Sequence, residues 1–115
     1  MHMLNWNGYR EQVLSGVGGI AKLTPDTTRG YAMLGGAGAK TGHLDAKTRE
    51  LIALGAAVTL RCDGCISVHT KAAHASGATK EEIAEALGVA ISLNAGAALV
   101  YSTRVMDAFD ALDEA

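Results

Sequence analysis

Apolar side chains recur every three or four residues along most of the chain, the spacing of amphipathic helices. Residues 1–23 carry this pattern and predict a first helix, although glycines at 16, 18 and 19 weaken it and can break it. Thr24 followed by Pro25 is a helix start signal. We expect a second helix from about Pro25 to Gly35 or somewhat beyond, and a glycine-rich loop over residues 37–43.

Two further helices are predicted on either side of residue 62. Asp45 fits the N-cap of a third helix that reaches Leu60 or Arg61. A fourth helix should begin within residues 62–64 and end at Gly77, which suits a left-handed C-cap.

The remaining residues predict two more helices. Thr79 and Glu82 form the pattern of a capping box, and the helix that follows carries Asn94 on an otherwise apolar face. A last helix is expected over about residues 97–112. No segment shows sustained strand alternation, so we predict an all-α fold of five or six helices, forming a single compact domain over residues 1–115.

Composition narrows the classes of partner. The chain has fourteen glycines and only five aromatic residues (one Trp, three Tyr, one Phe), so its helices should pack closely through small side chains, as in a homo-oligomer. A net charge of −2 with mixed signs predicts neither a nucleic-acid partner nor a lipid surface. No uninterrupted apolar run reaches the roughly 18 residues of a membrane span, and no secretory leader is recognisable. A cytoplasmic protein is expected.

The candidate chemistry lies in residues 50–69. The only two cysteines, Cys62 and Cys65, precede His69 at i, i+3 and i+7, which places all three on one face of a helix. One short Cys-x-x-Cys loop constrains an unfolded chain little. In a reducing compartment such a pair indicates redox chemistry or metal binding.

These residues suit peroxide reduction. Cys65 falls in the first turn of the predicted fourth helix, where unpaired N–H groups favour the thiolate that attacks an O–O bond. His69, four residues later, can take the thiol proton, and Glu50 from the preceding helix can orient that histidine. Cys62 can then condense with the sulfenic acid on Cys65 to give a disulfide.

Simpler interpretations remain open. The cysteines could be small buried apolar residues, and Glu50 could be a solvated helix residue. A zinc site is a more specific alternative, with Cys62, Cys65 and His69 as three ligands and Glu50 or His74 as the fourth. However, a structural zinc site usually draws its second pair of ligands from a separate element.

The pattern Glu-x11-Cys-x2-Cys-x3-His, formed by Glu50, Cys62, Cys65 and His69, resembles the alkylhydroperoxidase D-like (AhpD-like) branch of the carboxymuconolactone decarboxylase family. The flanking segments 49–54 and 77–87 are similar to that family's core, and the resemblance covers roughly residues 20–110. It implies an all-helical domain that assembles into trimers or hexamers, of which we favour the hexamer, with the site near a subunit boundary.

The resemblance also implies roles and partners. Cys65 would attack the peroxide, Cys62 would resolve it, and Glu50 with His69 would relay protons, without a metal or cofactor. The substrate would be hydrogen peroxide or a small organic hydroperoxide. An external dithiol, such as a lipoyl-bearing protein, would reduce the disulfide. Some members carry histidine just before the second cysteine, where this chain has Gly64.

We therefore expect a thiol-dependent peroxidase or disulfide oxidoreductase. Two alternatives stay open. One is a decarboxylase of a lactone acid, a chemistry that the wider family includes and that does not need two thiols. The other is a redox sensor whose disulfide changes subunit packing.

Overall fold

The computed structural model describes residues 1–114, which form helices and connecting turns and contain no strand. The helices are α1 (Trp6–Leu23), α2 (Pro25–Thr41), α3 (Ala46–Leu60), α4 (Asp63–Ala75) and α5 (Lys80–Ala111), followed by a 3-10 turn η1 (Leu112–Glu114). The all-α prediction is confirmed.

The predicted start signals lie at helix starts, although the Thr24 side chain makes no capping hydrogen bond to the backbone of α2. Pro25 is the first residue of α2, and the Asp45 carboxylate accepts a hydrogen bond from the Thr48 backbone N–H at 2.8 Å. At the start of α5, the Thr79 hydroxyl accepts from the Glu82 N–H while the Glu82 carboxylate accepts from the Thr79 N–H, at 3.0 and 2.9 Å. These caps satisfy backbone donors that the helices leave free.

Two predictions are wrong: the loop over residues 37–43 and the division of residues 80–112 into two helices. Helix α1 is the one helix that was expected and has no break at its glycines, whereas α2 runs to Thr41, so most of the expected loop is helical. It stops at Gly42, where φ of +71° takes the backbone out of the helix. The two helices expected over residues 80–112 are one helix, since the segment around Gly96 has no turn residue that ends it. An interior glycine costs only about 1 kcal/mol relative to alanine, too little to stop a helix alone.

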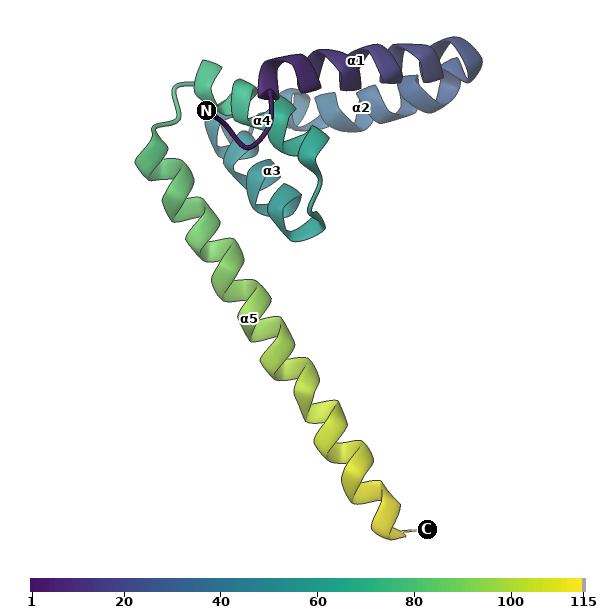
Figure 1. Ribbon diagram of the computed structural model, residues 1–115, viewed down its shortest axis with the longest axis vertical. Helices are drawn as coiled ribbons and strands as arrows, with labels where there is room; N and C mark the ends of the chain where they lie inside the picture. Colours follow the sequence, from purple (N-terminus) through teal and green to yellow (C-terminus); the bar gives the residue numbers. More distant parts are fainter. Residues whose placement is uncertain (115) are drawn as a thin grey trace.

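Helix α3 packs against both α4 and α5, and α1 packs against α4 and runs side by side with α2 (Figure 1). The core is small. Its buried residues are Leu54, Ala57, Ser67, Ala73 and Ala90. Short side chains let α3 and α4 approach closely. This close contact fixes the position of α4, which begins just after Cys62, relative to α3.

The chain on its own is not compact. Its radius of gyration is 18.9 Å, whereas a compact chain of this length would have about 13 Å. The excess comes from α5, whose second half projects away from the other helices (Figure 1). Among the described residues, the segment Lys80–Glu114 is long and apolar enough to cross a membrane, and only 6% of its most apolar window is buried.

Candidate active site

The turn between α3 and α4 places both cysteines at the start of a helix. Arg61 ends α3 in the left-handed conformation, with φ of +54°, and this reversal makes Cys62 the N-cap of α4. The Cys62 sulfur accepts a hydrogen bond from the Cys65 backbone N–H at 3.2 Å. One unpaired N–H group of the first turn is therefore satisfied by sulfur, at the end of the helix where the dipole favours negative charge.

Cys62 and Cys65 are joined by a disulfide, with their Cα atoms 5.2 Å apart. This separation lies within the usual range for a disulfide, so the backbone of the first turn of α4 needs no rearrangement to close it. Both residues are only partly buried. A short, accessible pair of this kind can be opened by an external thiol.

Glu50 and His69 meet across the contact between α3 and α4. The Glu50 Oε2 atom lies 2.7 Å from His69 Nδ1, and the two side chains are 23% and 30% exposed. A carboxylate accepts from Nδ1–H, so this hydrogen bond leaves Nε2 of the neutral ring as the free proton acceptor. His69 lies one helical turn beyond Cys65 on the same face, which is where an acceptor for the thiol proton is needed.

Gly64 lies where α1 crosses the start of α4. A Cβ atom on Gly64 would lie 3.4 Å from Cγ1 of Val13, an ordinary van der Waals distance, so this contact does not by itself require glycine. The Arg10 guanidinium holds α1 in this place, since its Nε donates to the Ser67 backbone carbonyl at 3.0 Å.

The structure thus forms two pairs from the four predicted site residues: the Cys62–Cys65 disulfide and the Glu50–His69 hydrogen bond. Asn94, left undecided by the sequence, belongs elsewhere: its amide donates to the Thr59 hydroxyl and ties α5 to α3. Arg10 and Val13 were missed as supports of α4. No local pattern marks them, because their importance depends on where α1 crosses a helix more than fifty residues later.

The residues proposed for a zinc site do not form a ligand set in the part of the chain that the structure describes. No three or more His, Cys, Asp or Glu side chains in residues 1–114 are grouped so that they could hold a metal ion. His74 lies on the exposed side of α4.

Comparison with known proteins shows the family. A family model described as the carboxymuconolactone decarboxylase family matches residues 25–108, which include all four site residues. The chain belongs to the carboxymuconolactone decarboxylase family. Helix α1, which covers Gly64, lies outside the residues that match the family model.

Relatives of this carboxymuconolactone decarboxylase family protein occur in several bacteria. The chain is 47% identical to an uncharacterised protein of Haemophilus influenzae over 105 residues, which cover 91% of this chain and 93% of that protein. It is 32% identical to an uncharacterised protein of Cupriavidus necator, over 84% of this chain and 85% of the relative.

A crystal structure shows a similar fold. It is the apo form of a carboxymuconolactone decarboxylase family protein from Legionella pneumophila, which is 33% identical to this chain. The two structures superpose with a TM-score of 0.73 over 91% of this chain and 94% of the other. The likeness extends over nearly the whole chain.

Proposed function

We propose that the protein is a thiol-dependent hydroperoxidase of the alkylhydroperoxidase-like kind. The observation that carries this proposal is the disulfide at the start of α4 on the same helical face as His69, whose ring is hydrogen-bonded to Glu50. A reversible thiol pair with a histidine and a carboxylate beside it has the parts that two-electron peroxide reduction needs.

In the reduced protein, His69 Nε2 takes the proton from the Cys65 thiol, and Glu50 stabilises the resulting imidazolium through Nδ1–H. The Cys65 thiolate attacks the terminal oxygen of ROOH. The O–O bond breaks, an S–O bond forms, and the proton held by His69 passes to the departing RO⁻ to give ROH. Sulfur is oxidised by two electrons and the peroxide is reduced by two.

The Cys62 thiol then attacks the Cys65 sulfenic acid, releasing water and forming the Cys62–Cys65 disulfide. An external dithiol closes the cycle: one thiolate attacks the disulfide, the second resolves the mixed disulfide, and the protein recovers both thiols. The partners are therefore a hydroperoxide and a dithiol donor, for which a lipoyl group is suitable. Assignment of attack to Cys65 rests on its place one turn from His69, whereas Cys62 lies two turns away.

The experiment is to follow hydroperoxide consumption with a lipoyl dithiol as donor, for the wild type and for Cys65→Ser. Many turnovers in the wild type and none in the variant support the proposal. One equivalent of peroxide consumed without turnover would support a sensor instead. Release of carbon dioxide from a lactone acid that survives replacement of both cysteines would support a decarboxylase.

A further inference from the structure

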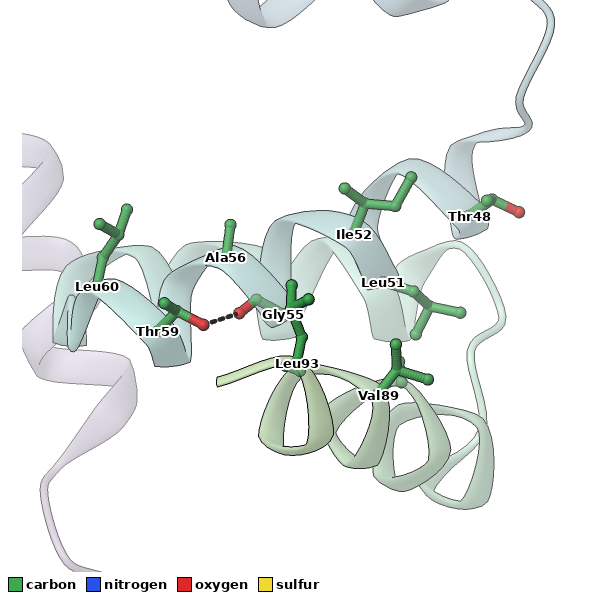
Figure 2. Close-up of a pocket in the computed structure, with 11 residues that line it drawn as sticks. Thr48, Leu51, Ile52, Gly55, Ala56, Thr59, Leu60, Val89 and Leu93 are labelled. Atoms are coloured by element: carbon green, nitrogen blue, oxygen red, sulfur yellow. Dashed lines mark hydrogen bonds between the residues drawn. The ribbon is translucent and has the colours of Figure 1, made fainter. Parts of the chain in front are cut away.

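Two cavities of the chain differ in the polar groups that line them. The larger one, of about 670 Å³ between α3 and α5, is lined mainly by aliphatic side chains and has no charged residue in its wall (Figure 2). The smaller one, of about 180 Å³, is formed by α1 and α4 and is lined by Trp6, Arg10, Ile66, Ser67 and Thr70. The smaller cavity combines aromatic surface with a cation, which are features that orient a small ligand.

The positive charge of Arg10 has no counter-ion within residues 1–114. Its side chain is partly buried and takes part in none of the ion pairs of these residues. Its Nε donates to the Ser67 carbonyl at 3.0 Å, and Nη1 and Nη2 both donate to the Asn7 amide oxygen at 3.1 and 3.0 Å. Both acceptors are neutral. Since a charge that is withdrawn from water is normally paired, the cavity wall favours an anion beside Arg10.

Arg10 also keeps hydrogen-bond donors for such an anion. A guanidinium has five N–H groups, and three of them are used by Ser67 and Asn7. One N–H group remains on each terminal nitrogen. The Thr70 hydroxyl, in the wall of the same cavity, is a further donor. A carboxylate has two oxygens that can accept from these groups, and carboxylates are the anions that guanidinium groups pair with most specifically.

The rest of the cavity suits a flat apolar group. Trp6 and Ile66 supply aromatic and aliphatic wall. A volume of about 180 Å³ is slightly larger than the roughly 150 Å³ of a cavity that accommodates benzene. We propose that this cavity binds a small aryl carboxylate of about the size of benzoate, with its carboxylate on Arg10 and its ring against Trp6.

This site is distinct from the cysteine site. Successive residues of a helix are rotated by about 100°, so Ser67 and Thr70 lie roughly 160° and 140° around α4 from Cys65. A ligand in the cavity therefore leaves the disulfide uncovered. It would instead bridge α1 and α4, beside the hydrogen bond from Arg10 to Ser67. Helix α1 precedes the residues that match the family model, so half of this site lies outside the family's core.

The test measures benzoate binding by isothermal titration calorimetry and by the fluorescence of Trp6, the single tryptophan of the chain. Benzyl alcohol, which has the ring without the charge, is the control ligand. Arg10→Gln removes the cation, and Thr70→Phe fills the cavity from an exposed position. Lys71→Gln removes an exposed cation next to Thr70 that does not line the cavity, and is the matched control. Far-UV circular dichroism checks that each variant is folded.

We expect benzoate to bind the wild type and Lys71→Gln with the same Kd, on the order of 1 mM, which is typical of so small a ligand. Arg10→Gln should weaken binding by at least about tenfold, and benzyl alcohol should bind the wild type more weakly by a similar factor. Thr70→Phe should abolish binding.

Three results would overturn the proposal. The first is the absence of saturable binding to the wild type up to about 20 mM benzoate, well above the expected Kd. The second is equal affinity of the wild type for benzoate and benzyl alcohol, which would exclude a role for the charge. The third is unchanged benzoate affinity in Arg10→Gln or in Thr70→Phe. If Arg10→Gln does not fold, the result with Thr70→Phe decides, because position 70 is exposed and its variant keeps the bond from Arg10 to Ser67.

Discussion

The hydrogen bond between Glu50 and His69 gives the sharpest test of the site. In Glu50→Gln the amide oxygen can still accept from His69 Nδ1–H, so the geometry is kept while the negative charge is lost. A hydrogen bond to a charged group contributes about 1.5–3 kcal/mol, and the partial exposure of both side chains favours the lower end. Since about 1.4 kcal/mol corresponds to a factor of ten, the second-order rate of hydroperoxide consumption should fall roughly tenfold.

The assay is stopped-flow oxidation of the reduced protein, so that the external donor does not limit the rate. Glu81→Gln, which removes an exposed acid from the first turn of α5, is the matched control and should react at the wild-type rate. If Glu50 acts through the histidine, the double variant Glu50→Gln/His69→Gln should be no slower than His69→Gln alone. An unchanged rate in Glu50→Gln, or two single effects that multiply in the double variant, would refute the relay.

The packing and the surface ion pair give three further predictions, each measured by urea unfolding. Gly64→Ala should leave the free energy of unfolding within about 1 kcal/mol of the wild type, because its Cβ atom would meet Val13 at an ordinary contact distance. A loss above about 2 kcal/mol, the size of an overpacking effect, would contradict this. Leu54→Ala, at a buried position, should cost about 2–3 kcal/mol, and a loss below 1 kcal/mol (about the size of a surface effect) would show that the core lies elsewhere. The hydrogen bond with Lys47 lowers the pKa of Glu82 below its ordinary 4.5. The ionised Glu82 therefore contributes fully to stability above pH 4.5, and this contribution is lost as the pH falls through the pKa of the folded protein. Glu82→Gln should lack this loss of stability in acid, and a pH profile identical to that of the wild type would contradict the role given to Glu82.

The placement of the candidate site residues could be predicted from the sequence because most of them lie close together in the chain. Cys62, Cys65 and His69 lie within eight residues, and a helix beginning at position 63 is enough to place them on one face. Glu50 was placed correctly because α3 and α4 are joined by a tight turn at Arg61, which folds one helix back on the other.

What the sequence could not predict depends on long-range packing. The contact of Gly64 with Val13 joins residues that are far apart in the chain, so no local pattern indicates it. The continuous α5 was predicted as two helices. Its second half projects away from α1–α4 (Figure 1), a direction that the sequence pattern does not indicate.

The measurement that tests the central claim most directly is the identity of the cysteine that peroxide oxidises. Cys62→Ser cannot form the disulfide, so a sulfenic acid on the attacking cysteine should accumulate and can be captured with a dione reagent that is specific for sulfenic acid. Mass spectrometry of the reduced variant after one equivalent of hydroperoxide should show the adduct on Cys65. No adduct on Cys65, together with a ready adduct on Cys62 in Cys65→Ser, would contradict the account.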